Sequence, residues 1–190
     1  MNKILTKIIK NQPIILNNSI KRFYCKSSLK DDDSGRIYLV KYEDSEKMIK
    51  VGDKDEFIKT FSKDDIKLFS ELCGDFNPIH LDEEYSKRTK FGRCIVHGAL
   101  VSSLIPSVVS KSIPGSIYIN QEVNFLKPTF IDDTVKAETT ILSISGKKIV
   151  FDTKCTVISN SNDNINDIVI KGNSTIYHSG LSSKRTNNNK

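Results

Sequence analysis

The sequence predicts an α+β domain in which an antiparallel sheet wraps around one long central helix. Residues 95–112, IVHGALVSSLIPSVVSKS, form the most apolar stretch of the chain, which is too short and too rich in serine to cross a membrane. Four β-rich runs follow Pro114–Gly115. Because an apolar helix must be buried on every side, a sheet curved around it is the economical packing.

The first elements lie before this helix. Residues 55–62 alternate apolar and polar side chains, which predicts a strand. Ser62 then has the place of a helix N-cap, with Asp65 three residues later completing a capping-box pattern. The helical spacing of Ile66, Phe69, Leu72 and Cys73 continues this helix, which should end at Gly74.

The remaining elements follow in order. Asp82 can cap a second short helix. The central helix should begin near His97 or Gly98, and Pro106 should kink or shorten it. The four strands are expected within residues 116–128, 133–146, 147–159 and 167–179, with turns at Lys127–Pro128, Ser145–Gly146 and Asn160–Asn166. Short turns between successive strands indicate an antiparallel sheet.

The net charge of +6 is concentrated at the N-terminus. Residues 1–30 contain seven basic residues and no acidic one, and the rest of the chain carries 22 basic and 23 acidic residues. A near-neutral domain argues against a nucleic-acid partner. The chain contains no run of 18 apolar residues, so no membrane-spanning helix is predicted.

The basic, acid-free residues 1–30 are typical of a mitochondrial presequence, and a disordered tail is the alternative. The stretch RFYC, Arg22 to Cys25, resembles a matrix-processing site with cleavage after Tyr24. We therefore expect a presequence at 1–30, a linker or N-terminal extension at 31–47, the folded domain at 48–179 and a disordered tail at 180–190.

The four cysteines form no CxxC pair and have no histidine at ligand spacing, so neither a zinc site nor a disulfide framework is predicted. They fit buried, small apolar groups in a reducing compartment.

The stretch GDFNPIH, residues 74–80, places an acid and a base five residues apart, at Asp75 and His80. Pro78 should exclude helix from this segment, and Asn77 can anchor it as a loop. Aspartate can donate a proton and histidine can accept one near neutral pH, which suits the reversible removal of water. Taken alone, the spacing is better explained by an ordinary turn, because aspartate and asparagine are common turn residues.

The longer stretch GDFNPIHLDEEYSKRTKFGRCIVHGALVSS resembles the signature of the MaoC-like, or type 2, enoyl-thioester hydratases, which have the hotdog fold. The resemblance continues through GSIYINQEVNFLKPTFIDDTV and spans roughly residues 57–145. With an N-terminal presequence, it is closest to the mitochondrial 3-hydroxyacyl-thioester dehydratases of fatty-acid synthesis.

The resemblance implies site residues and partners. Asp75 and His80 would be the catalytic pair, Asn77 would support their loop, and the backbone N–H of Gly98 would polarise the thioester carbonyl. The substrate would be an acyl-[acyl carrier protein] or acyl-CoA, used without a metal or other cofactor by a homodimer in the mitochondrial matrix.

Some residues of the matched region keep open or minor roles. The family often carries a substrate-contacting hydroxyl near Pro106, for which Ser102, Ser103 and Ser107 are the candidates. For His97 we expect a structural role, in packing or in a hydrogen bond at the helix start, and for His178 a solvated one.

Three other functions compete with the dehydratase. An (R)-specific enoyl-CoA hydratase would run the same chemistry on CoA thioesters. A hotdog thioesterase would need a carboxylate on the central helix, where residues 95–112 hold no acid. A non-enzymatic binding module, including an RNA-binding one, is disfavoured by the near-neutral charge of residues 31–190.

Overall fold

The computed structural model describes residues 36–42, 45–159 and 166–185. The predicted presequence and the asparagine-rich turn at 160–165 lie outside these residues. The strands are β1 Arg36–Tyr42, β2 Ser45–Ile49, β3 Lys54–Thr60, β4 Ile117–Phe125, β5 Thr134–Ser145, β6 Lys148–Ser159, β7 Ile168–Tyr177 and β8 Leu181–Arg185. The helices are α2 Lys63–Cys73, α3 Pro78–Leu81, α4 Glu83–Lys87, α5 Gly98–Ser102 and α6 Leu104–Ser112.

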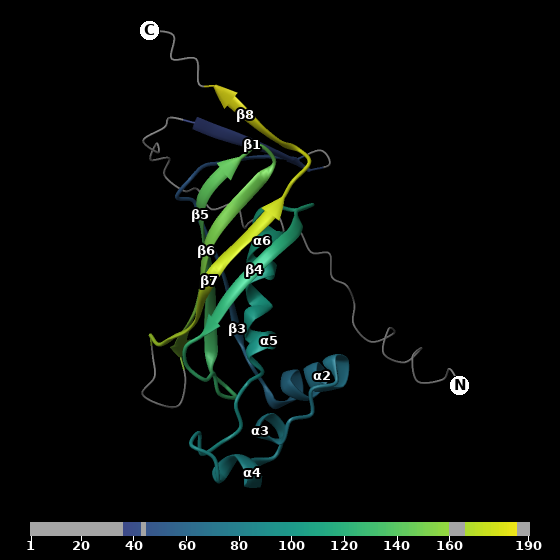
Figure 1. Cartoon of the computed structure of the whole chain (residues 1–190), viewed down its shortest axis with the longest axis vertical. Coiled ribbons are helices and arrows are strands. Elements are labelled where there is room, and N and C mark those ends of the chain that lie inside the picture. The colour runs from purple at the N-terminus through teal and green to yellow at the C-terminus, as the bar shows by residue number, and fades with distance from the viewer. Residues whose placement is uncertain (1–35, 43–44, 160–165, 186–190) are drawn as a thin grey trace, which may run out of the picture. The chain divides into compact units, whose positions relative to one another are not determined.

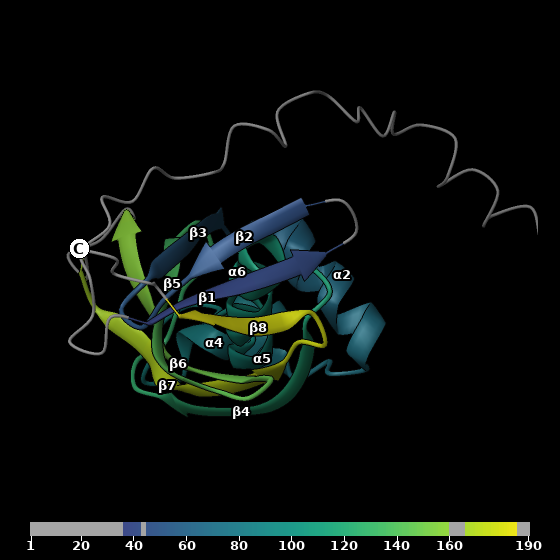
Figure 2. The same ribbon diagram turned by 90° about the horizontal axis from the view of Figure 1, so that it is seen from above.

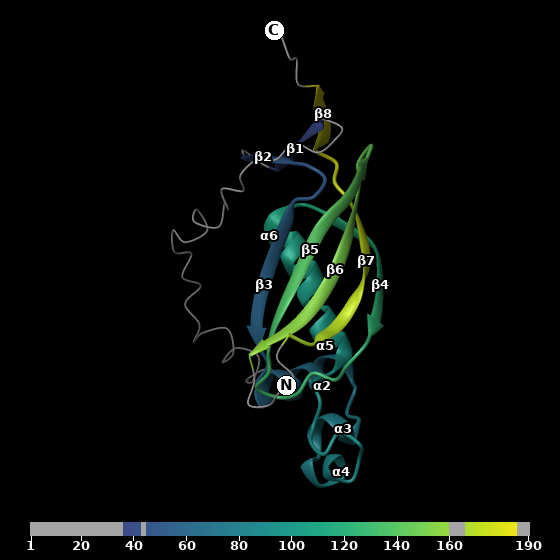
Figure 3. The same ribbon diagram turned by 90° about the vertical axis from the view of Figure 1, so that its left-hand side faces the viewer.

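A five-stranded antiparallel sheet of order β3-β5-β6-β7-β4 curves around α5 and α6 (Figures 1 and 3). Seen from above, the strands surround the end of α6 on several sides (Figure 2). The predicted fold class, an antiparallel sheet wrapped around a central helix, is therefore confirmed, and all four predicted C-terminal strands are present.

The order of the strands in the sheet departs from their order in the chain at β4. Strand β4 pairs with β7 at the sheet edge rather than with β5, its successor in the chain. The connection after Lys127–Pro128 instead contacts the segment before α5, since Val96 N–H donates to Thr129 O over 2.8 Å and Ile95 bridges Phe130. Before it enters β5, the chain therefore runs alongside the segment that precedes α5. These backbone contacts fix the residues that lead into α5.

The central helix is divided at Ser103, as the position of Pro106 predicted. Proline has no N–H, so the carbonyl of Ser102, four residues earlier, loses its helical partner. Gln121 Nε2 of β4 donates to that carbonyl over 3.2 Å. The interruption is therefore compensated by the sheet, which satisfies the backbone group that proline leaves free.

The core lies between the helix and the concave face of the sheet. Val101, Ile105 and Val108 of the helix are at most 1% exposed and pack with β5 and β6, where Val135, Ala137, Cys155 and Val157 are fully buried. Each such aliphatic side chain contributes about 1.5–3 kcal/mol by leaving water. Cys94 and Cys155 are buried free thiols as expected, whereas Cys73 is exposed at the end of α2.

A second sheet of order β2-β1-β8 involves segments that the sequence placed outside the domain. Residues 31–47 were expected to be a linker or N-terminal extension, and 180–190 a disordered tail, whereas β1 begins at Arg36 and β8 reaches Arg185. Strand β1 pairs with β8 although the two strands lie far apart in the sequence, so no local pattern predicted this pairing. Ile49 and Leu181 anchor this sheet in an apolar cluster with Val109 and Ile176.

Among the described residues, no helix has both the length and the apolar character that a membrane span requires.

Candidate active site

Helix α2 delivers the chain to the site. Ser62 and Asp65 form the predicted capping box, in which the Ser62 hydroxyl accepts from Asp65 N–H and the Asp65 carboxylate accepts from Ser62 N–H. The helix ends at Gly74, which has the left-handed φ of 80° that glycine adopts without a steric penalty. Asp75 directly follows this turn, so both predicted ends of α2 are confirmed.

The next segment is a short helix, and the expectation of an extended loop was wrong. Asn77 is the N-cap of α3, where its side-chain oxygen accepts from Ile79 N–H over 3.3 Å, and Pro78 is the first helical residue. Proline is tolerated there because the N–H of a first-turn residue has no helical partner. His80 therefore projects from a helical turn, and Asn77 N–H donates to Asp75 Oδ1 over 3.2 Å.

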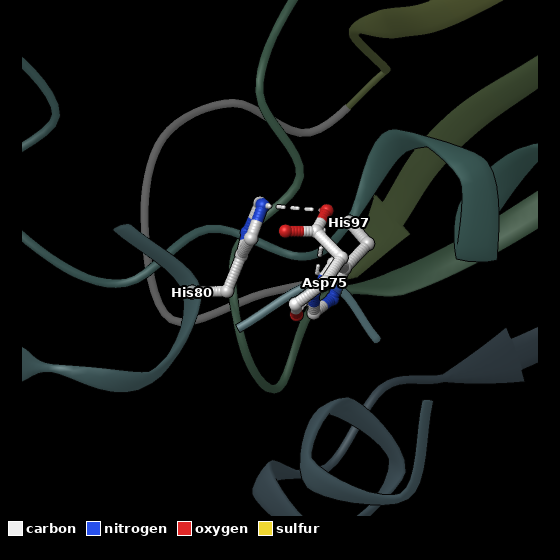
Figure 4. Close-up of side chains that lie close together, drawn as sticks. All are labelled: Asp75, His80 and His97. Carbon is white, nitrogen blue, oxygen red and sulfur yellow. Dashed lines mark hydrogen bonds and ion pairs between the residues drawn. The ribbon is translucent and has the colours of Figure 1, made fainter. Parts of the chain in front are cut away.

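Asp75 and His80 face each other, with 3.9 Å between Asp75 Oδ2 and His80 Nε2 (Figure 4). His80 Nδ1 lies 2.8 Å from the carbonyl oxygen of Ile95. Because a carbonyl only accepts, Nδ1 carries the proton of the neutral ring and Nε2 keeps a free lone pair. The carboxylate of Asp75 is 51% exposed and the side chain of His80 10%, which gives a fixed base beside an accessible acid.

His97, for which we expected a structural role in packing or in a hydrogen bond at the helix start, also lies in this cluster. Its side chain is 2% exposed, and Nε2 lies 3.1 Å from the backbone oxygen of Asp75 and 3.9 Å from its Oδ2. The rings of His97 and His80 are stacked, with centroids 3.8 Å apart and an interplanar angle of 27°. The only feature of the sequence that indicated a place for His97 near the site is its position directly before Gly98.

The surroundings of His97 favour its neutral form. Burial lowers the pKa of His97, and the nearby His80 lowers it further, against opposing effects of the Asp75 backbone and carboxylate.

Asp75, His80 and His97 each offer one atom that can ligate a metal, and these atoms lie within 4.8 Å of one another. A ligating imidazole nitrogen needs a free lone pair. His97 Nε2 instead faces the carbonyl oxygen of Asp75, so a proton rather than a lone pair is directed into the cluster. The arrangement fits acid–base chemistry better than metal binding.

Gly98 is the first residue of α5, and a Cβ atom built there would lie 2.7 Å from Cε1 of Phe125. The Phe125 ring therefore covers the side of Gly98 that a side chain would occupy. The three candidate hydroxyls all bond backwards to helix carbonyls: Ser102 to Ala99, Ser103 to Leu100 and Ser107 to Ser103.

His80 also lines a shallow pocket at the surface, between α2 and the segment around Cys94. Its other lining residues are Lys63, Asp64, Ile66, Lys67, Leu81, Glu83, Cys94 and Ile131. Neither Asp75 nor Gly98 lines this pocket.

The third histidine of the chain lies away from the cluster and was wrongly expected to be solvated. His178 is 2% exposed; its Nε2–H donates to Pro114 O over 2.9 Å, and its Nδ1 accepts from Gly180 N–H over 3.1 Å. The strand pattern did not reveal that the chain folds back after β7 and covers this ring.

Known proteins resemble this chain over the same region. Residues 45–165 match the family model of the MaoC like domain. A mitochondrial 3-hydroxyacyl-[acyl-carrier-protein] dehydratase of Arabidopsis thaliana is 35% identical over 115 residues, which cover 58% of this chain and 69% of that protein. An (R)-specific enoyl-CoA hydratase of Rhodospirillum rubrum is 37% identical over 132 residues, covering 67% and 87%. The solved (R)-hydratase of A. caviae involved in PHA biosynthesis superposes with a TM-score of 0.63 at 29% identity, covering 68% and 97%.

Proposed function

The chain belongs to the MaoC-like domain family, and from this premise we propose that Asp75 and His80 catalyse its reaction. The chain is a hydro-lyase for the reversible dehydration of (3R)-hydroxyacyl thioesters to trans-2-enoyl thioesters. The observation that carries the assignment of these residues is the unprotonated Nε2 of His80, which faces an accessible carboxylate at 3.9 Å.

In dehydration, His80 Nε2 takes the proton from C2 of the substrate. Asp75, in its protonated form, gives its proton to the C3 hydroxyl, which leaves as water while the double bond forms between C2 and C3. The site then holds an imidazolium and a carboxylate. Transfer of the proton from His80 to Asp75 restores the starting state, and hydration follows the same steps in reverse.

The C2 proton becomes acidic only if the thioester oxygen can bear negative charge. We assign this stabilisation to the backbone N–H of Gly98, at the start of α5, where the amide is oriented before the reaction. Glycine supports the assignment because it places no side chain of its own between the amide and a substrate. Asn77 supports the pair through two hydrogen bonds. Its side-chain oxygen caps α3, and its backbone N–H donates to the Asp75 side chain.

The acyl carrier, the assembly and the location extend this proposal. The similarity to a mitochondrial acyl-carrier-protein dehydratase supports an acyl-[acyl carrier protein] substrate in fatty-acid synthesis, and the similarity to a CoA hydratase supports acyl-CoA as the alternative. We further propose a homodimer and, from the basic residues 1–30, import into the mitochondrial matrix.

The test of the reaction uses the purified full-length chain with crotonyl-CoA and with crotonyl-[acyl carrier protein]. Hydration removes the enoyl absorbance, and the ratio of kcat/KM for the two substrates identifies the preferred carrier. The His80→Ala variant is the matched blank. If the absorbance stays constant with both substrates, the proposed function is wrong.

The location has its own test. Residues 1–30 fused to a fluorescent reporter should carry it into mitochondria, and the mature protein should begin near Cys25 by mass spectrometry. A fusion in which Lys3, Lys7 and Lys10 are replaced by glutamine is the control. A cytosolic protein that retains Met1 would contradict import.

A further inference from the structure

We propose that His97 is a positioning residue that stays neutral and holds the acid, the base and the start of α5 in one arrangement. This inference rests on the proposed roles of Asp75 and His80. It adds a residue with no contact to the substrate, which acts through hydrogen bonding and stacking.

The first observation fixes the proton of His97. Its Nε2 faces the carbonyl oxygen of Asp75 at 3.1 Å, with the Asp75 carboxylate at 3.9 Å and the Ser70 hydroxyl at 3.3 Å. The Asp75 carbonyl oxygen only accepts, so Nε2 must be the protonated nitrogen. His97 therefore holds the backbone of the catalytic acid from a side chain that is itself buried.

The second observation is the opposite nitrogen. Nδ1 of His97 is buried and, within the part of the chain that the structure describes, has no hydrogen-bond partner. A buried polar atom without a hydrogen bond destabilises the fold, so a histidine here is poorly explained by stability alone. The residue with this unsatisfied nitrogen lies directly beside the acid–base pair.

The third observation is the stack. The His97 ring lies between the face of His80, at 3.8 Å, and the ring of Phe69, whose centroid is 5.1 Å away in an edge orientation. This packing restricts rotation of the His80 ring, so its Nδ1 keeps its bond to Ile95 and its Nε2 stays directed toward the site. The titratable groups that face His97 are Asp75 and His80, whereas α2 presents the uncharged Phe69 and Ser70.

The fourth observation concerns the helix start. His97 is the N-cap of α5, yet its side chain makes no capping hydrogen bond. A serine or aspartate there would normally accept from an N–H of the first turn. Because the His97 ring is turned toward Asp75, its side chain caps no N–H group in the first turn of α5. Gly98, the proposed oxyanion donor, is the first residue of that turn.

The test compares two substitutions that separate the functions of the ring. His97→Gln keeps an N–H donor near the position of Nε2 but loses the stack, and His97→Phe keeps a flat ring but loses the donor. Misplacement of reacting groups by about 1 Å can cost on the order of 10²-fold in rate. We expect His97→Phe to lower kcat about 10²-fold at nearly constant KM. His97→Gln, which keeps the donor to Asp75, should have a kcat much closer to that of the wild type.

His178→Gln is the matched control, because His178 is equally buried and also donates to a backbone carbonyl, at the far end of the central helix. It should lower the melting temperature without changing kcat of the folded protein. A His97→Phe protein that is folded and turns over at the wild-type rate would overturn the proposal. Losses of kcat that follow only the folded fraction in both His97 variants would do the same.

A measurement on the unmodified protein keeps the proposal testable if the variants do not fold. At pH 6.5, the ordinary pKa of a histidine, nitrogen-15 NMR should show His97 mainly as the neutral ring with its proton on Nε2. A mainly charged His97 at that pH, or a proton on Nδ1, would refute the inference. This result does not depend on turnover, so a wild-type chain that hydrates neither thioester would count against the proposed function alone.

Discussion

The two ends of the central helix each hold a histidine that is 2% exposed, and the two differ in how their nitrogens are satisfied. His178, near the end of α6, has partners on both nitrogens, Pro114 O and Gly180 N–H. His97, at the start of α5, donates from Nε2 to Asp75 and leaves a buried Nδ1 without a partner among the described residues. Equal burial therefore accompanies complete hydrogen bonding at one end and incomplete hydrogen bonding at the other.

The difference in hydrogen bonding indicates a structural role for His178 and a role in catalytic geometry for His97. A fully bonded buried histidine joins segments of the fold, and His178 joins the end of α6 to the chain after β7. A histidine stacked on a base, with an unsatisfied nitrogen, is expected where catalytic geometry rather than stability decides the residue. Changes at the start of the helix should therefore lower activity more than stability, and changes at its end the reverse.

The largest effect is expected at the acid–base pair. Asp75→Asn and His80→Ala should each lower kcat/KM by about 10²–10⁴-fold while the melting temperature changes little. The double variant should be only slightly worse, because residues that act as a unit are not additive. Glu71→Gln, at an exposed glutamate of α2, is the control. Steady-state hydration of crotonyl-CoA measures the effect, and near-normal turnover in His80→Ala would exclude the mechanism.

The next effect is expected at Gly98. A side chain there should crowd the thioester and weaken its oxyanion donor, and loss of one such donor costs about 10²–10³-fold. Gly98→Val also meets Phe125, whose ring is 58% exposed and can turn away. We therefore compare kcat/KM of Gly98→Val, Phe125→Ala and the double variant. If removal of Phe125 restores full activity, Gly98 only provides packing space and is not the oxyanion donor.

At the other end of the helix, His178→Ala should act on stability. Its loss empties a buried site and removes the donor to Pro114 O, which costs about 1–3 kcal/mol in the free energy of unfolding. Urea denaturation measures this cost, and kcat of the folded fraction should equal that of the wild type. A His178→Ala protein with unchanged stability but lower kcat would reverse the comparison between the two ends.

The smallest effect is expected in the pH dependence of stability. In the unfolded chain His97 should titrate near its ordinary pKa of about 6.5, whereas burial lowers its pKa in the folded protein. Between these two values the unfolded state binds more protons, so the free energy of unfolding should fall as the pH decreases from 6.5 toward the folded pKa. His97→Gln should lack this contribution.

Urea denaturation at pH 7.5 and pH 5.5 tests the difference between the wild type and His97→Gln. In this range Asp65, whose pKa is lowered by the backbone N–H of Ser62, stays ionised in both proteins. A wild-type protein whose stability does not decrease relative to His97→Gln would contradict a neutral His97.

Features that depend on neighbouring residues were predicted correctly. Ser62 and Asp65 cap α2, Gly74 ends it, and Asp82 caps α4 through the N–H of Tyr85. Pro106 interrupts the central helix for the same reason, since a missing N–H acts within one turn. The helix of Pro78–Leu81 was missed because the same proline that excludes a helix interior is favourable at a first helical position.

The sequence by itself determined the fold class, the order of the main elements and the pairing of an acid with a base, because periodicity, caps and short motifs act over a few residues. Only the tertiary structure placed β4 beside β7, joined β1 to β8 and stacked His97 on His80. These contacts unite residues far apart in the chain or on different elements. They depend on how the sheet closes around the helix and on which polar atoms this closure buries, and no local pattern encodes either one.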